Sequence, residues 1–446
     1  MNQFTAPLWG DEAFSAILSM KSIPQIIEII RRDTSPPLYN ITEHLAFRLF
    51  GVSEITIRGL SFFYYLLTIV FVFLIAKLIW DKKTAILASL LTFFNPFFFI
   101  YAFEGRMYAI MALGVAGSMY FFLKLLFAAK KTNKAPKGTI LGYILATSWA
   151  LYSHHFAIFI VFIQGFWWLF ELITKNFKFI KWQLIAFLGT GILYIPWLLP
   201  LYEQTQMVGG GFWLGKPTLT DLRTLIYEYI ATGIKHPLAD YALYLSLTAL
   251  LIRRWDKNIK ISLILATWFL GPIIMTFTIS QFFQPVFYNR YLLYTIPAWG
   301  LLIAGARRKV ISFIIIAGIL SLFIRIDWHY FNNPTKLPFN QLAQFVIESK
   351  RNDDTLINWS AGSHHLWESK FYGIPAPIYV KEGGGELPFF VGTALMEETD
   401  VIKTLPDEGR IGVITSGPVE EVAITGYTEI ESKSFGNLKF IWLEKN

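Results

Sequence analysis

Long apolar runs separated by short polar connections fill the middle of this chain. Between about positions 55 and 327 ten runs can be counted, each near the length of about 20 residues that an α-helix needs to cross a ~30 Å hydrocarbon layer. They extend over 55–80, 83–101, 106–128, 139–153, 156–173, 182–201, 238–253, 259–280, 290–305 and 310–327. The pattern predicts a polytopic membrane protein, a mainly α-helical bundle with about ten transmembrane helices.

The stretch before the first run is mixed in polarity. Residues 11–50 carry too many charged side chains to lie in hydrocarbon. Isoleucines at positions 23, 26, 27 and 30 have helical spacing with charges opposite them, which predicts a helix on the membrane surface. Pro36 and Pro37 break this helix, and a second surface helix over 38–49 should end at Gly51.

The chain changes character after position 328. Clusters of Gly and Pro alternate with short β-like runs, "TLINWSA", "APIYV", "RIGVITS" and "LKFIWLE", and a helix is predicted at about 339–350. We therefore expect three regions: a first loop over 1–54, a transmembrane bundle over 55–327 and a small soluble α/β domain over 328–446.

Two histidines and a glutamate in the tail have a spacing that would suit a metal on a helix. They are His364, His365 and Glu368, but Gly362 and Gly373 flank them, so a solvated loop is favoured. Metal-ligand spacing occurs nowhere else along the chain, and no metal site is predicted from it.

Composition supports the membrane assignment. Hydrophobic residues make up 54% of the chain and aromatic residues 17%, more apolar material than one soluble core of 446 residues would bury. The chain has no cysteine, which excludes disulfides and thiolate chemistry.

The net charge of +8 is mostly a signal of membrane topology. Sixteen lysines and arginines fall in the connections of one side, within 82–83, 130–137, 175–181, 253–260 and 307–309. The connections of the other side hold only Arg106, Lys216, Arg223, Lys235 and Arg290. The positive-inside rule places the first set in the cytoplasm, so no nucleic-acid partner is implied.

This orientation gathers the chemically interesting side chains on one face. The first loop, the tail and the following residues all lie on the outer side: Asp11, Glu12, Asp33, Glu104, Arg106, His154, His155, Glu203 and Arg290. We therefore expect an extracytoplasmic active site above a helical bundle. An outer amino terminus without a signal peptide predicts a further apolar helix upstream; unaided translocation of the short segment is the alternative.

Several motifs along the chain resemble one family. "LWGDEAFS", "DTSPPLYN", "LFGVSEITIRGLSFF", "NPFFFIYAFEGRMYAI", "LYSHHFAIFIVFIQ", "YIPWLLPL" and "NRYLLYTIPAWGLLIAGA" are similar, in order and spacing, to the multi-pass glycosyltransferases of the GT-C fold. The most similar groups are the bacterial and archaeal protein O-mannosyltransferases and the lipid A aminoarabinose transferases. The match covers about residues 7–305.

The resemblance implies an inverting glycosyltransferase of the cell envelope. It would move a sugar from a polyprenyl-phosphate donor to an acceptor outside the cytoplasm, with both the active site and the C-terminal domain extracytoplasmic, in the plasma (inner) membrane. Protein, lipid A, another glycolipid and a cell-wall polymer stay open as acceptors. The alternative is a transporter or flippase, but few charges lie at mid-span, where a transport pathway would have them. A lipid-binding scaffold is a third interpretation.

The reaction needs a base, and three carboxylates are candidates. Asp11 matches the catalytic acid of the family and is the expected general base for the acceptor hydroxyl. Glu12 points about 100° away on a helix, which suits orienting a partner such as an arginine. Glu104 could bring a second carboxylate to the site. The competing reading of the adjacent acids is a solvated helix start.

The departing phosphate needs cations and hydrogen-bond donors. Arg58, Arg106 and Arg290 lie at the outer membrane level, where bidentate phosphate contacts and interfacial snorkelling are both open. Tyr108 and Tyr291 could donate to phosphate or belong to the aromatic belt.

Two further residues are candidates for the donor site. His154 matches a family position and could hydrogen bond to substrate, or it could cap a helix end. Asp33 could reach the phosphate through a divalent cation. No cofactor is firmly implied.

Overall fold

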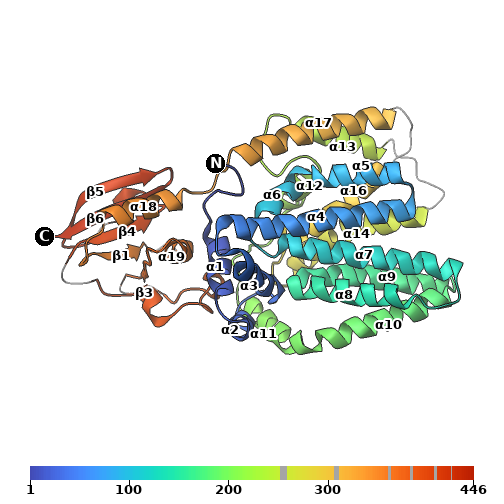
Figure 1. Cartoon of the computed structure of the whole chain (residues 1–446), viewed down its shortest axis with the longest axis horizontal. Coiled ribbons are helices and arrows are strands. Elements are labelled where there is room, and N and C mark those ends of the chain that lie inside the picture. Colours follow the sequence, from blue (N-terminus) through green and yellow to red (C-terminus); the bar gives the residue numbers. More distant parts are fainter. Residues whose placement is uncertain (252–258, 306–310, 360–362, 382–384, 406–408, 423) are drawn as a thin grey trace. The chain divides into compact units, whose positions relative to one another are not determined.

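The structure is a computed structural model of the full chain and describes residues 1–251, 259–305, 311–359, 363–381, 385–405, 409–422 and 424–446. The chain forms two compact units (Figure 1). The helical unit comprises residues 34–39 and 58–332, and the sheet-containing unit comprises residues 1–33, 40–57 and 333–446. The first 33 residues thus share a unit with the tail.

Apolar helices build the helical unit. They are α4 (Glu54–Ile79), α5 (Lys82–Phe93), α6 (Pro96–Ile100), α7 (Tyr108–Lys131), α8 (Lys137–Ser153), α9 (Ile158–Ile173), α10 (Phe177–Tyr194), α11 (Leu198–Gly209), α12 (Leu219–Ile230), α13 (Ala239–Leu251), α14 (Ile259–Phe282), α15 (Asn289–Leu292), α16 (Ile296–Ala304) and α17 (Ile311–Asn332). Short 3-10 turns η1 (Tyr101–Phe103), η2 (His155–Ala157), η3 (Ile195–Trp197) and η4 (Leu293–Thr295) join some of them. Every predicted apolar run therefore contains at least one helix, although the run 83–101 is broken at residues 94 and 95.

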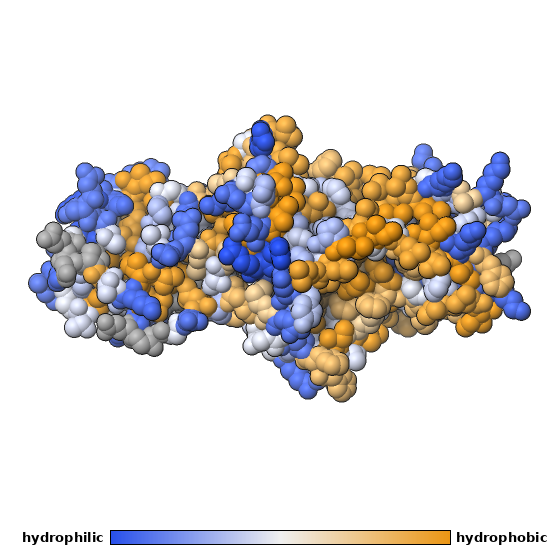
Figure 2. Space-filling model, turned by 90° about the horizontal axis from the view of Figure 1, so that it is seen from below, coloured by the Kyte–Doolittle hydropathy of each residue, from blue (hydrophilic) through white to orange (hydrophobic). Residues whose placement is uncertain are grey.

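Six stretches in the described part of the chain are long and apolar enough to cross a membrane. A seventh is α5 with the segment 96–103, which bend by 62° at a break. The count is below the predicted ten because α8, α13 and α16 are only 17, 13 and 9 residues long. Apolar side chains cover much of the outer surface of these helices, as lipid contact requires (Figure 2).

Close approach and a polar network hold α7, α8 and α9 together. A Cβ placed on Gly114 of α7 would lie 2.6 Å from the backbone nitrogen of Ala150 on α8, so only glycine allows this contact. Ser118 lies 2.8 Å from the hydroxyl of Thr147, and the amide of Gln164 donates to Ser118 at 2.9 Å. These buried bonds satisfy polar groups that lipid would leave unpaired.

Three helices open the sheet-containing unit: α1 (Gly10–Ser19), α2 (Ile23–Arg31) and α3 (Leu38–Phe50). The spacing of the isoleucines therefore predicted α2 correctly, with Ile26 and Ile30 buried. Gly51, which ends α3, has the positive φ of 80° expected of a glycine cap.

The tail folds into a six-stranded sheet of order β3-β2-β1-β4-β6-β5. The strands are β1 (Thr355–Asn358), β2 (Ile378–Tyr379), β3 (Val401–Ile402), β4 (Ile411–Thr415), β5 (Tyr427–Phe435) and β6 (Leu438–Lys445). Strands β1 to β4 pair in parallel, and β6 pairs antiparallel with both β4 and β5. The four predicted strands are confirmed, and α18 (Phe339–Ser349) is the predicted helix.

The predicted solvated loop around His365 is wrong, because residues Ser363–Phe371 form helix α19. His365 and Glu368 are buried, and their side chains lie 2.5 Å apart. Gly362 lies outside the described residues, and Gly373 follows the helix with a φ of 75°, as a glycine after a helix end does. Gly373 therefore ends a short helix instead of preventing one.

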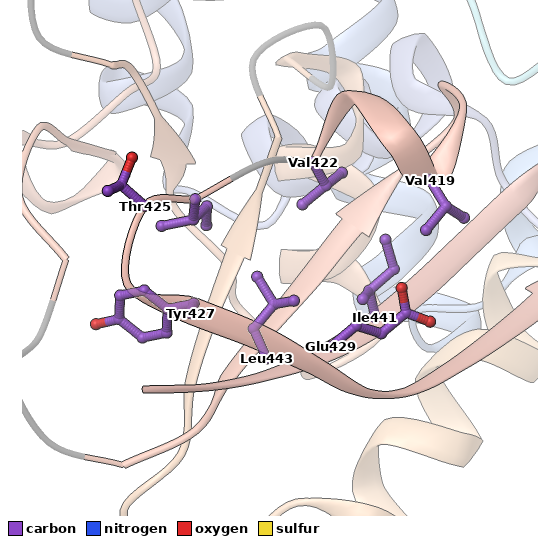
Figure 3. Close-up of a pocket in the computed structure, with 8 residues that line it drawn as sticks. Val419, Val422, Thr425, Tyr427, Glu429, Ile441 and Leu443 are labelled. Atoms are coloured by element: carbon purple, nitrogen blue, oxygen red, sulfur yellow. The ribbon is translucent and has the colours of Figure 1, made fainter. Parts of the chain in front are cut away.

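The two faces of the sheet carry separate apolar layers. Phe440 and Trp442 of β6 pack with α18, whereas Ile441 and Leu443 point to the opposite face. A hollow of about 260 Å³ opens on that face (Figure 3). Aliphatic side chains make most of its lining: Val419, Val422, Ile424, Thr425, Tyr427, Glu429, Ile441 and Leu443.

The amino terminus packs against the tail within this unit. The backbone N–H of Leu8 donates to the hydroxyl of Tyr372 at 2.9 Å, and the Phe14 ring lies edge-on to Trp367. These contacts place the first turn of α1, which carries Asp11 and Glu12, beside the C-terminal domain.

Candidate active site

Aromatic rings surround Arg290 at one end of the helical unit. Its guanidinium carbon lies 5.1 Å from the ring centre of Tyr288, 5.7 Å from that of Tyr108 and 6.0 Å from that of Tyr291. Stacking engages the flat face of a guanidinium, whereas phosphate is bound through its edge, so both contacts can be made at once. The predicted residues Tyr108, Arg290 and Tyr291 therefore lie together.

His154 adds a neutral donor to the same cluster. Its ring lies 5.2 Å from that of Tyr291, and its Nδ1 accepts the Phe156 backbone N–H at 3.1 Å. Burial, together with His155, Arg106 and Arg290, holds the pKa of His154 well below its usual range. The imidazole is thus uncharged at neutral pH, and its proton resides on Nε2, where it can be donated.

Glu104 and Arg106 come from the segment between η1 and α7. The N–H of Arg106 donates to the carbonyl oxygen of Glu104 at 2.8 Å, which closes a tight turn. Tyr101, at the start of η1, packs its ring 5.4 Å from that of Tyr108. Glu104 is buried, and Arg106 lies near enough to His154 to influence its charge. The predicted loop thus contributes to the cluster around Arg290.

His155 points to a different partner from His154. Its Nε2 lies 2.8 Å from the side-chain oxygen of Gln204, and the amide of Gln204 donates to the backbone oxygen of Ser35 at 3.2 Å. The two histidines therefore have different neighbours. His155 joins η2 to Gln204 of α11, which itself holds the "DTSPP" segment, and His154 faces the aromatic cluster.

The carboxylates of α1 lie in the other unit and differ sharply from each other. Glu12 is fully buried and accepts a hydrogen bond from Lys336 Nζ at 2.6 Å. Asp11 is half-buried in the first turn of the helix. Lys336 is 324 positions away from Glu12, and no local pattern indicates this contact.

The remaining predicted residues, Arg58 and Asp33, come from α4 and from the segment after α2. Arg58 is fully buried within α4. Asp33 follows α2, is buried, and its N–H donates to the Ile30 carbonyl oxygen at 3.1 Å. Among the described residues, no group of three or more His, Asp or Glu side chains could hold a metal ion.

Sequence reasoning missed residues that support this cluster. Tyr288 stacks on Arg290, and Asn289 is bonded to Glu228 on α12. Asn289 is the first residue of the "NRY" motif and Tyr288 directly precedes that motif, so closeness to Arg290 in the chain is the signal that indicates both residues.

Comparison with known proteins identifies related folds. Residues 34–199 match the family model described as dolichyl-phosphate-mannose-protein mannosyltransferase. No curated protein sequence matches the chain.

Solved structures match nearly the whole chain. ArnT from Cupriavidus metallidurans in the apo state is 12% identical, with a TM-score of 0.68 over 98% of this chain and 94% of that one. ArnT from the same organism bound to undecaprenyl phosphate is also 12% identical, with a TM-score of 0.67 over 99% of this chain and 94% of that one. The apo oligosaccharyltransferase of Archaeoglobus fulgidus is 12% identical, with a TM-score of 0.54 over 91% of this chain and 66% of that one. The predicted GT-C fold and the resemblance to membrane glycosyltransferases are confirmed.

Proposed function

We propose that this membrane protein is an inverting glycosyltransferase that uses a sugar carried on a polyprenyl phosphate. The observation that carries the proposal is the cluster of Arg290, Arg106 and neutral His154 among tyrosine rings. Two guanidinium groups and an imidazole N–H suit a phosphate that gains negative charge as it leaves.

A lipid-linked donor also needs space for its chain. An apolar groove of about 660 Å³ lies among α8, α9 and α10. Ile158 and Leu169 of α9 both line it, and the eleven residue steps from one to the other span about 16 Å of helix. Leu151 and Ile158, which line one end, flank His154 in sequence. This groove would hold a prenyl chain whose phosphate lies near the Arg290 cluster.

The reaction would proceed by a single displacement. Asp11 would take the proton of the acceptor hydroxyl, and the acceptor oxygen would attack the anomeric carbon as its bond to the phosphate oxygen breaks. The electron pair of that bond leaves with the phosphate, whose charge Arg106 and Arg290 would stabilise. Attack from the face opposite the leaving phosphate inverts the anomeric centre.

The orientation of the protein in the membrane belongs to the same proposal. The lysine- and arginine-rich connections would face the cytoplasm of a plasma (inner) membrane, and the cluster and C-terminal domain would lie outside. The acceptor would be a protein, lipid A, another glycolipid or a cell-wall polymer.

A panel of polyprenyl-phosphate sugars tests the function. The purified full chain is incubated with each donor and with peptide, lipid A and glycan acceptors, and donor loss and product mass are followed. We expect one donor to be consumed with release of the polyprenyl phosphate and formation of an inverted product. Movement of intact donor across vesicles without consumption would favour the flippase alternative instead.

A further inference from the structure

Asn289, the residue before Arg290, is held at three of its polar groups. Its side-chain amide donates to Glu228 Oε2 at 2.7 Å. Its side-chain oxygen accepts the Arg290 backbone N–H at 2.7 Å. Its backbone oxygen accepts the hydroxyl of Tyr229 at 2.5 Å. The start of α15 is therefore fixed from α12 by two consecutive residues.

Helix α12 is itself anchored to the bundle near α6 (Figure 1). The Tyr229 ring is fully buried and lies 4.9 Å from that of Phe97. The amide of Asn95 donates to the Tyr229 backbone oxygen at 2.7 Å, and the hydroxyl of Ser246 donates to that of Ile230 at 2.9 Å. Because α12 is held in place, its hydrogen bonds to Asn289 can fix the position of the next residue, Arg290.

We propose that Glu228 and Tyr229 are positioning residues, which act through Asn289 to hold Arg290 where it binds the donor phosphate. This inference rests on the proposed function, since it assigns Arg290 a phosphate to bind. Neither residue needs to touch the substrate. Their contribution is geometric, because a guanidinium that binds phosphate through two N–H groups tolerates little displacement.

Binding of the bare lipid carriers tests the proposal without the sugar or acceptor. Undecaprenyl phosphate and dolichyl phosphate are titrated separately into the full chain in detergent. Loss of a hydrogen bond to a charged group costs binding about tenfold. Glu228→Ala should therefore raise the dissociation constant about tenfold, whereas Glu228→Gln, whose side-chain oxygen can still accept from Asn289, should largely restore it.

Tyr229→Phe is the second variant, because it removes the hydroxyl that donates to Asn289 and keeps the ring packed on Phe97. It should weaken binding by a few-fold, with only a small fall in unfolding temperature, because one hydrogen bond is lost and the ring stays packed. Thr224→Ala is the matched control, an exposed position on the same helix, and should bind as the parent does. In turnover, the Glu228 and Tyr229 variants should raise the KM for donor more than they lower kcat.

A double-mutant cycle separates positioning from general damage to the fold. If Glu228 acts through Arg290, Glu228→Ala should add little to the loss caused by Arg290→Ala. Full additivity of the two losses, or unaltered binding by Glu228→Ala and Tyr229→Phe, would overturn the positioning role. Failure of the unmodified chain to bind either carrier would overturn the proposed function itself.

Discussion

A carboxylate in each of the two units is bonded to a different kind of partner. In the sheet-containing unit, Arg410 donates to both oxygens of buried Asp354, at 3.0 and 2.6 Å. In the helical unit, Arg290 lies among tyrosine rings, and the carboxylate of Glu228 accepts from the neutral amide of Asn289. A cationic partner favours the ionised form of a carboxylate, whereas a neutral amide offsets less of the cost of burying that charge.

The carboxyl groups show the same contrast in their acidity. Burial alone would raise the pKa of Asp354, but its hydrogen bonds and attraction to Arg410 bring that pKa below the usual value. Burial raises the pKa of Glu228, and the hydrogen bond from Asn289 only partly opposes this. A partner of opposite charge therefore decides the direction of each shift.

The largest expected effect comes from Asp11→Asn. The neighbouring Glu12 is hydrogen-bonded to Lys336, so we expect a structural role for Glu12 and a catalytic role for Asp11 within the same helix turn. Removing a general base should slow transfer by about 10² to 10⁴-fold while the protein remains folded. Transfer rates are compared with those of Glu28→Gln, an exposed acid on α2. A rate within a few-fold of that control would exclude Asp11 as the base.

Arg410→Ala should cost the sheet-containing unit about 3 kcal/mol, because the buried charge of Asp354 loses its partner. Chemical unfolding followed by tryptophan fluorescence measures the change. Arg410→Lys should restore part of the loss, and Lys350→Ala, an exposed lysine nearby in sequence, serves as the control. If Arg410→Ala and the control were equally stable, the ion pair between Arg410 and Asp354 would not contribute to the stability of this unit.

Arg290→Ala should weaken donor binding by about 30-fold, the value of a charge-assisted hydrogen bond of about 2 kcal/mol, without destabilising the fold. The dissociation constant of a polyprenyl phosphate is the measurement. Arg290→Lys keeps the charge but loses the planar fork, so intermediate affinity is expected. A large fall in unfolding temperature with unchanged affinity would place Arg290 with the structural ions.

The smallest effect is the dependence of stability on pH. Since the folded pKa of Asp354 is lowered, its contribution is present above the unfolded value of about 4 and is lost as pH falls through the folded value. The raised pKa of Glu228 acts in the opposite sense: its contribution is present below the unfolded value and is lost as pH rises through the folded value.

Unfolding temperatures measured across acid pH check both signs. Asp354→Asn should flatten the fall in stability below about pH 4, and Glu228→Gln should remove a loss that sets in as pH rises. Slopes of the same sign at both positions would contradict the contrast between the units.

Sequence patterns predicted the structural features that depend on residues close together in the chain. Apolar runs located the membrane helices, and short β-like runs between Gly and Pro clusters located β4 and β6, whose side chains divide between two apolar layers. Strand β5 escaped notice because Thr428 to Ser434 are mostly exposed and polar, so burial leaves no alternation there. Helix α19 has no apolar stripe that spacing could indicate, because polar His365, Glu368 and Ser369 are buried alongside Leu366 and Trp367.

The candidate site was predicted only in part, because sequence motifs consist of residues that are close together in the chain. The motifs named Arg106, Tyr108, His154, Arg290 and Tyr291, and the structure brings them into one cluster. The supporting contacts could not be read from spacing, since Glu228 and Asn289 are 61 positions apart. The catalytic roles themselves stay predictions that the variants above address.

The close contact of α7 with α8 has a consequence for how this sequence can vary. A side chain at position 114 would meet the backbone of Ala150, and no substitution elsewhere can remove a backbone atom. A Cβ on Gly142 would meet only the ring of Phe121, at 2.4 Å, which a smaller partner would relieve. A library that randomises both glycines should therefore retain glycine at 114 in every functional clone, and should accept alanine at 142 when position 121 shrinks with it.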